Sequence, residues 1–124
     1  MPYIEPAAAR RFDMHGATFT ALAAPSSGAV RNAAWMVRIE HGEAGVVHRL
    51  SDEETFVCLG GRAIAQVGDA RHELSAGGAL IVPPDTEFAL TKVGEEPFQA
   101  VVVLPVGATA RVGAAAPFTP PWAV

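Results

Sequence analysis

The chain has 124 residues, half of them apolar and 18% charged, with 12 glycines and 10 prolines. This length accommodates one hydrophobic core, and the composition is typical of a globular, turn-rich protein rather than a disordered one. The formal net charge of −4 argues against a nucleic-acid partner, which normally requires a basic surface. No apolar run is long enough to span a bilayer, and the first residues lack a charged-then-apolar signal pattern. We therefore expect no membrane partner and a cytoplasmic location.

Residues 1–16 contain few periodic apolar positions and predict an extended N-terminal arm with at most one short strand or helical turn. The first clear alternation runs through residues 33–40. It places Trp35 and Val37 on one face of a strand and Met36 and Arg38 on the other. The sequence therefore predicts a strand that is half-buried on each side of a sheet.

Short apolar segments separated by turn residues follow at regular intervals, and no apolar pattern of helical spacing persists over three turns. This pattern is typical of an all-β sandwich or barrel. We predict six to ten antiparallel strands forming one β-barrel or jelly roll, with almost no helix, followed by a Pro-rich tail over residues 105–124. The further strands are expected at residues 46–50, 55–59, 63–67, 72–74, 79–82, 88–91 and 98–104.

The stretch from Gly42 to Gly61 carries the most specific pattern. A histidine, His48, stands six residues before a glutamate, Glu54, and an apolar strand then runs into paired glycines. Cys58 in that strand is the only cysteine, which excludes an internal disulfide and a cysteine metal cluster. A buried, structural thiol is its expected role.

This stretch resembles the first motif of the cupin superfamily: Gly, five residues, His-x-His, a short spacer, Glu, six residues and Gly. Gly42, His48, Glu54 and Gly61 match it, whereas Leu50 stands at the second histidine. The second cupin motif is matched by a glycine and a proline, but its glycine, histidine and asparagine are replaced. The resemblance implies a small single-domain cupin, of the conserved-barrel type, over residues 1–124, with its core at about 33–104. The second-motif residues are, in order, Gly77, Pro83, Asp85, Phe88 and Lys92.

In cupins the motif histidines and glutamate converge on one divalent metal inside the barrel. Here Leu50 and Phe88 stand at two of those positions, so the resemblance implies a degraded metal site. A transition-metal site usually has three or four protein ligands. We therefore predict no metal and no other cofactor. A divalent metal held weakly by His48 and Glu54 is the alternative.

Strand alternation places His48 and Leu50 on one face, and likewise Glu54, Phe56 and Cys58. A buried His and Glu in an apolar pocket are the usual ingredients of proton transfer. We predict His48 as the catalytic base and Glu54 as the group that fixes its tautomer. For Arg38, which is a candidate pocket residue, the alternative is a solvated side chain. Surface positions are expected for His15, His41 and His72. The predicted pocket residues are Met36, Arg38, Leu50, Phe56, Cys58, Phe88 and Leu90.

Three functions remain open from the sequence. The first is a metal-independent isomerase, lyase or polyketide-cyclase-like enzyme acting on a small, largely apolar molecule. The second is a non-catalytic binding or sensor protein, and the third a weakly metal-dependent enzyme. Because small cupins commonly pair, and because an exposed sheet edge favours association, we also expect a homodimer.

Overall fold

A computed structural model describes residues 1–124. All paired strands are antiparallel and no α-helix is present, which confirms the predicted all-β fold. No helix of the molecule is long and apolar enough to cross a membrane. The strands are β1 (Arg11–Met14), β2 (Ala17–Ala23), β3 (Asn32–Ile39), β4 (Arg49–Leu50), β5 (Glu54–Gly60), β6 (Arg62–Val67), β7 (Ala70–Ser75), β8 (Ala79–Val82), β9 (Phe88–Val93), β10 (Phe98–Pro105) and β11 (Ala110–Arg111).

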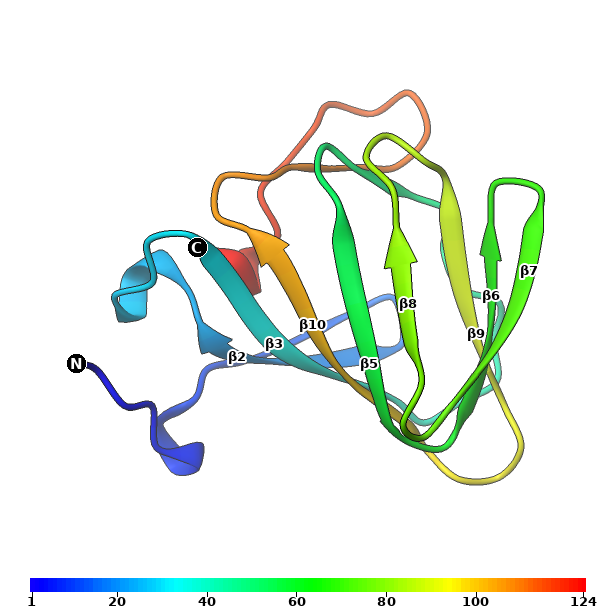
Figure 1. Cartoon of the computed structure of the whole chain (residues 1–124), viewed down its shortest axis with the longest axis horizontal. Coiled ribbons are helices and arrows are strands. Elements are labelled where there is room, and N and C mark those ends of the chain that lie inside the picture. Colours follow the sequence, from blue (N-terminus) through cyan, green and yellow to red (C-terminus); the bar gives the residue numbers. More distant parts are fainter.

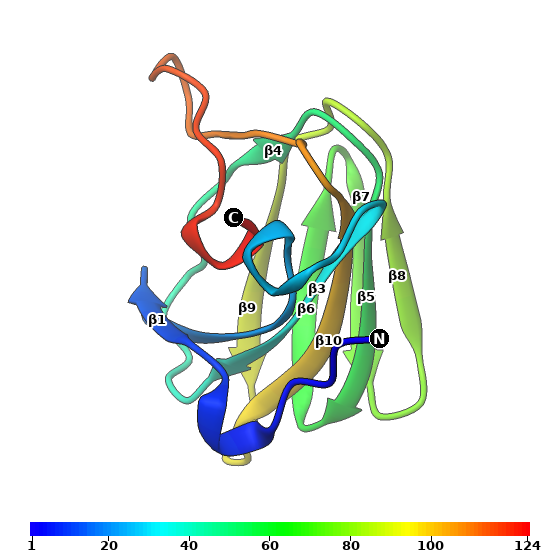
Figure 2. The ribbon, with the colours of Figure 1, turned by 90° about the vertical axis from the view of Figure 1, so that its left-hand side faces the viewer.

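There are eleven strands, more than the six to ten predicted, because the count includes β4 and β11, which are only two residues long. They form a six-stranded sheet in the order β1-β2-β3-β10-β5-β8, a three-stranded sheet β7-β6-β9, and the two-stranded pair β11-β4. Figures 1 and 2 show the two larger sheets curving around a common interior. This arrangement is a jelly-roll barrel whose core is enclosed by the inner faces of both sheets.

Strand alternation explains which side chains form this core. In β3, Ala33, Trp35 and Val37 are buried, and the residues between them are partly exposed. The neighbouring β10 follows the same period, with Phe98 and Val102 fully buried. Burying large apolar side chains of this kind contributes about 1.5–3 kcal/mol each, so the alternation fixes which face of each strand turns inward.

Two glycines allow the motif segment to approach its neighbours closely. A Cβ atom at Gly61, whose φ is +68°, would lie 2.2 Å from the carbonyl oxygen of Pro97. A Cβ at Gly45 would lie 2.1 Å from the carbonyl oxygen of Leu90. Only glycine fits such contacts, and the one at Gly45 brings the segment that carries His48 against β9.

Asp85 stands where the second cupin motif has a glycine, yet it keeps the backbone conformation that a glycine would adopt. Its φ of 51° lies in the left-handed region, which aspartate tolerates better than most residues. The amide of Asp85 donates to the carbonyl of Leu50 at 2.8 Å, which joins the two motifs. The replacement therefore preserves the turn.

The β1–β2 hairpin and the C-terminal tail pack onto the barrel, whereas residues 1–10 are largely exposed. Residues 1–16 contain the 3-10 turn η1 (Pro6–Ala8) as well as β1, where the sequence predicted at most one such element. Two further 3-10 turns are η2 (Pro25–Ser27) and η3 (Pro121–Ala123). In η3, Trp122 and Ala123 are buried, so the Pro-rich tail completes the interior of the barrel.

Candidate active site

A cavity of about 160 Å³ lies inside the barrel, lined by 23 residues of which 15 are hydrophobic. Apolar cavities of about 150 Å³ hold a molecule of the size of benzene, so this one accommodates at least an aromatic ring. No lysine or arginine is among the lining residues. The cavity is therefore suited to a largely apolar ligand without a strong negative charge.

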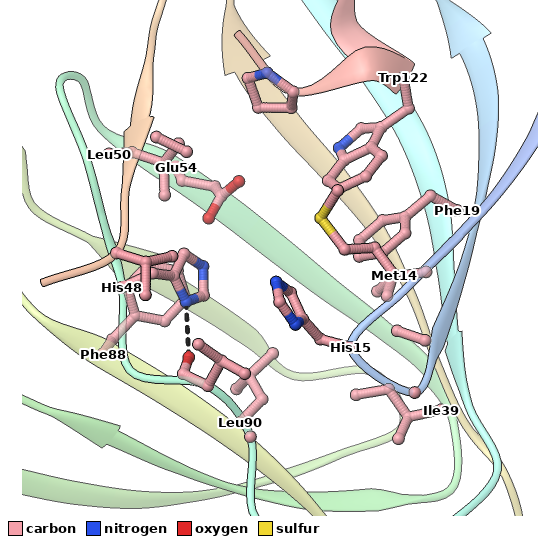
Figure 3. Close-up of a pocket in the computed structure, with 18 of the residues that line it drawn as sticks. Met14, His15, Phe19, Ile39, His48, Leu50, Glu54, Phe88, Leu90 and Trp122 are labelled. Carbon is pink, nitrogen blue, oxygen red and sulfur yellow. Dashed lines mark hydrogen bonds between the residues drawn. The ribbon is translucent and has the colours of Figure 1, made fainter. Parts of the chain in front are cut away.

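His48 enters the cavity from the segment just before β4 (Figure 3). Its backbone pairs with that of Phe88 through two hydrogen bonds, of 3.0 and 2.8 Å, which fixes the position of the residue. The Nδ1 atom lies 2.8 Å from the carbonyl oxygen of Val46. Because a carbonyl only accepts, Nδ1 carries the proton and Nε2 is left as a hydrogen-bond acceptor.

Burial lowers the pKa of His48, and the nearby His15 lowers it further, whereas the hydrogen bond to Val46 raises it. The imidazole ring lies against Phe88, with 4.3 Å between the ring centroids. With its pKa lowered below 6.5, His48 is mainly a neutral base near pH 7.

Glu54 begins β5 and points into the same cavity (Figure 3). The residue is 4% exposed, and its Oε1 atom is buried without a hydrogen-bond partner. Burial raises the pKa of this carboxyl group to about 8, because nothing nearby compensates the charged form. Glu54 is therefore a neutral carboxylic acid at pH 7 and can donate a proton.

The predicted role of Glu54 in fixing the His48 tautomer is wrong. The Val46 carbonyl holds Nδ1 of His48, and no hydrogen bond joins the two side chains. A backbone carbonyl two residues away is close by local geometry alone, whereas Glu54 lies on another strand. The structure thus presents two separate groups, one base and one acid, in place of a hydrogen-bonded dyad.

Four of the predicted pocket residues line the cavity: Leu50, Phe56, Phe88 and Leu90. Phe56 and Phe88 meet edge to face at 5.8 Å between centroids and form its apolar floor. Cys58 shares their face of β5 and is 1% exposed, but it lies beyond the cavity, with its Sγ atom 3.6 Å from the carbonyl oxygen of Gly60.

The structure corrects the prediction for Met36 and Arg38, which do not line the cavity. Trp35 and Val37 do so, because the bulky apolar face of β3 turns inward. The side chain of Arg38 is 44% exposed on the outer face and pairs with Glu40 at 2.8 Å. The alternation itself was visible in the sequence, but the choice of face for these two residues was incorrect.

A second wall, which the sequence pattern did not reveal, closes the cavity opposite His48. It combines Met14 from the end of β1, His15 from the β1–β2 turn, Phe19 from β2, and Trp122 from the C-terminal tail (Figure 3). Trp122 stacks on Phe19 with 3.6 Å between centroids and an interplanar angle of 2°. These residues come from opposite ends of the chain, so no local spacing relates them.

Two of the histidines expected at the surface also line this cavity. His15 and His41 are both exposed, yet both contribute to its lining, and His15 adopts a left-handed φ of 51° at the tip of the β1–β2 turn. His72 lies exposed on β7, away from the cavity. The sequence signal for His15 is slight: a His-Gly pair at a hairpin turn, with nothing to show where that hairpin docks.

The family model described as "Cupin domain" matches residues 35–104, more than half of the chain. The chain belongs to the cupin family. No curated protein sequence matches this cupin significantly. The matched range closely follows the core of about 33–104 that the two motifs delimited.

Solved structures share the fold at low sequence identity. The polyketide cyclase RemF from Streptomyces resistomycificus has a TM-score of 0.80 at 15% identity, covering 94% of this chain and 87% of that one. The cupin domain of Schizosaccharomyces pombe Cnp3 has a TM-score of 0.64 at 17% identity, covering 84% and 69%. A Lactobacillus farciminis oxalate decarboxylase in complex with formate has a TM-score of 0.69 at 18% identity, covering 77% and 30%.

The residues of this cupin do not fit the divalent metal that the family implies. No group of three or more His, Cys, Asp or Glu side chains is placed to hold an ion. Leu50 and Phe88 supply carbon where the motif supplies imidazole nitrogen, leaving one histidine and one neutral carboxyl group. A site of two ligands falls short of the three or four that transition metals usually bind. The absence of a bound metal from the isolated protein stays a prediction.

Proposed function

We propose that this cupin binds a small, largely apolar organic molecule in its cavity and transfers a proton on it through His48 and Glu54. One observation carries the proposal: a neutral base and a neutral acid face the same apolar cavity. Burial lowers the pKa of His48 and raises that of Glu54, so that near pH 7 the base is free to accept a proton and the acid still holds one, which is the setting for general acid–base catalysis.

In the proposed reaction the Nε2 atom of His48 takes a proton from a carbon next to a carbonyl group. The electron pair of that C–H bond forms a carbon–carbon double bond, and the carbonyl oxygen receives the proton of Glu54. The product of this step is a neutral enol, a histidinium and a glutamate. The Val46 carbonyl stabilises the histidinium through Nδ1–H.

An enol formed in this way leads to isomerisation, elimination or an aldol-type cyclisation, depending on the substrate. The similarity of fold to the polyketide cyclase RemF over 94% of this chain supports the cyclisation route. The apolar lining supports the same class of substrate, because it favours a ring system over a charged metabolite.

Exchange of carbon-bound hydrogen in D₂O tests this function without a known substrate. 2-Tetralone, a bicyclic ketone with acidic benzylic protons, is followed by proton NMR as it gains deuterium. We expect catalysed exchange by the wild type, lost by a factor of about 10² in the His48→Ala variant. His72→Ala, which changes an exposed histidine outside the cavity, is the matched control. Equal exchange by wild type and His48→Ala would refute the catalytic role.

The pH profile of this exchange provides a second test of the proposed catalysis. Activity needs neutral His48 and protonated Glu54, so we expect a lower limb below the ordinary histidine pKa of 6.5 and an upper limb near 8. In the Glu54→Gln variant the upper limb disappears, because the amide does not titrate. An unchanged upper limb in that variant would exclude Glu54 as the acid.

A non-catalytic binding protein is the second candidate function. The observation that favours it is the missing hydrogen bond between His48 and Glu54, since each group is held without reference to the other. In that case 2-tetralone binds in the cavity while wild type and His48→Ala give the same slow exchange. Measuring binding and exchange on the same sample separates the two functions.

We also propose that the chain forms a homodimer through the outer face of β5 and β8. Val57, Leu59 and Ile81 are 37%, 54% and 60% exposed on these neighbouring strands, and β8 is the edge of its sheet. Apolar side chains on an exposed edge favour association. Analytical ultracentrifugation should show a dimer for the wild type and a monomer for Leu59→Lys/Ile81→Lys.

A further inference from the structure

The C-terminal tail holds Trp122 firmly at the cavity. The carbonyl oxygen of Val124 accepts hydrogen bonds from Nη2 of Arg10, at 3.0 Å, and from Oγ of Ser26, at 2.7 Å. The indole ring also packs edge to face against Trp35, with 6.2 Å between centroids. Trp122 is therefore a fixed part of the cavity wall.

The polar atom of this tryptophan has no partner in the protein. Trp122 is 7% exposed, and its Nε1–H group is buried without a hydrogen bond. An unsatisfied buried donor costs about 1–3 kcal/mol, and native proteins satisfy almost all such groups. The one other buried side-chain atom without a partner is Oε1 of Glu54, which belongs to the same cavity.

The two groups face each other within the site. The indole nitrogen lies on the edge of the Trp122 ring that is turned toward Glu54 (Figure 3). Polar side chains of His15, His41, Glu43 and His48 also line the cavity, but none of them has a buried side-chain atom without a hydrogen-bond partner. Two buried, unpaired polar atoms in a largely apolar cavity indicate where the polar end of a ligand binds.

We propose that Trp122 donates its indole N–H to a carbonyl or phenol oxygen of the ligand, beside the Glu54 carboxyl group, and thereby selects neutral ketones and phenols. This deepens the proposed function, on which it rests for the role of Glu54. No lysine or arginine lines the cavity, and Glu43 and Glu54 do, so a carboxylate finds no cationic partner of the kind it usually binds. During enolisation the same N–H group donates to the oxygen on which negative charge develops and so stabilises that charge.

Indole NMR tests the contact directly in the wild type. In protein with ¹⁵N-labelled tryptophan, 2-tetralone should shift the Nε1–H resonance of Trp122 downfield, whereas the matched hydrocarbon tetralin should not. Trp122→Phe assigns the resonance. Equal shifts with both probes, or none with bound 2-tetralone, would overturn the proposal, and this measurement does not depend on the folding of any variant.

Affinities measured by calorimetry test the selectivity. Trp122→Phe keeps an aromatic ring but removes the donor, so we expect 2-tetralone to bind about tenfold more weakly relative to tetralin than it does in the wild type. Phe19→Leu is the control, because it alters the apolar wall without removing a donor and should weaken both probes alike. An unchanged ratio in Trp122→Phe, or tighter binding of 2-naphthoate than of 2-tetralone, would refute the proposal.

The His48→Ala variant separates this inference from the proposed function. If the His48→Ala variant loses hydrogen exchange and keeps the Trp122 shift, both the proposed function and the Trp122 contact stand. If wild type and His48→Ala exchange equally while the shift and the tenfold ratio persist, the catalytic proposal fails and the ligand contact stands. If exchange depends on His48 but the shift and the ratio are absent, only the Trp122 contact is refuted.

Discussion

The two walls of the cavity differ in origin and in task. The wall formed by β5, β9, and β4 with the segment just before it carries His48, Leu50, Glu54 and Phe88, all within the two motif segments. The opposite wall is built from the β1–β2 hairpin and the C-terminal tail, with Trp122 at its centre. The first wall supplies most of the ionisable chemistry, and the second supplies most of the enclosure.

The comparison teaches that the chemistry depends on the enclosure. Burial is the cause of the raised Glu54 pKa and the largest cause of the lowered His48 pKa. An exposed pair would titrate near ordinary values, with Glu54 ionised and His48 partly protonated at pH 7. The chain ends therefore help to set the protonation states of residues with which they share no sequence motif.

The largest expected effect concerns Glu54 and pH. Its folded pKa of about 8 lies above the ordinary 4.5, so the folded state holds the proton more tightly than the unfolded state. Its contribution to stability is complete below pH 4.5 and is lost as pH rises through about 8, a change of about 5 kcal/mol. Denaturant unfolding at pH 5 and 9 should show that Glu54→Gln removes most of this loss. A wild type and variant with parallel pH dependence would contradict the prediction.

Trp122→Ala should give the next largest effect. It deletes a buried aromatic side chain and should lower the free energy of unfolding by about 3–5 kcal/mol, measured in urea. The same change admits water to the cavity, so the Glu54 pKa should fall toward 4.5, as followed by carboxyl NMR. Ala116→Ser, in the exposed part of the tail, is the control. A stable variant with an unaltered Glu54 pKa would break the link between the two walls.

His48→Ala should affect the reaction and leave the fold intact. The residue is held by backbone pairing to Phe88, which alanine preserves. We expect hydrogen exchange to fall by a factor of about 10², about 2.7 kcal/mol, with circular dichroism unchanged. A loss of folded structure in this variant would instead give His48 a structural role.

The smallest expected effect is that of metal removal. Elemental analysis should find no stoichiometric iron, manganese, nickel or zinc, and EDTA should leave both exchange and stability unchanged. The double variant Leu50→His/Phe88→His should bind zinc or nickel, because it restores imidazole at both motif positions. About one equivalent of metal in the wild type, lost in His48→Ala, would support the metal-dependent alternative.

The sequence was most informative where neighbouring residues share one physical constraint. Alternation in β3 placed Trp35 and Val37 on one face and Met36 and Arg38 on the other, although it did not show which face lines the cavity. The motif spacing delimited a cupin core that the family match confirms. The strands expected at residues 63–67 and 72–74 also form, as the paired strands β6 and β7, with Val67 opposite Ala70. Each of these features depends on residues only a few positions apart.

The sequence by itself determined the all-β fold, the cupin family and the replacement of metal ligands by Leu50 and Phe88. Only the tertiary structure decided that the Val46 carbonyl, rather than Glu54, fixes the His48 tautomer, and that His15 and Trp122 close the cavity. The physical reason is the distance along the chain over which each effect acts. Strand period and glycine conformation act within a few residues, whereas the docking of both chain ends depends on burial summed over the whole barrel.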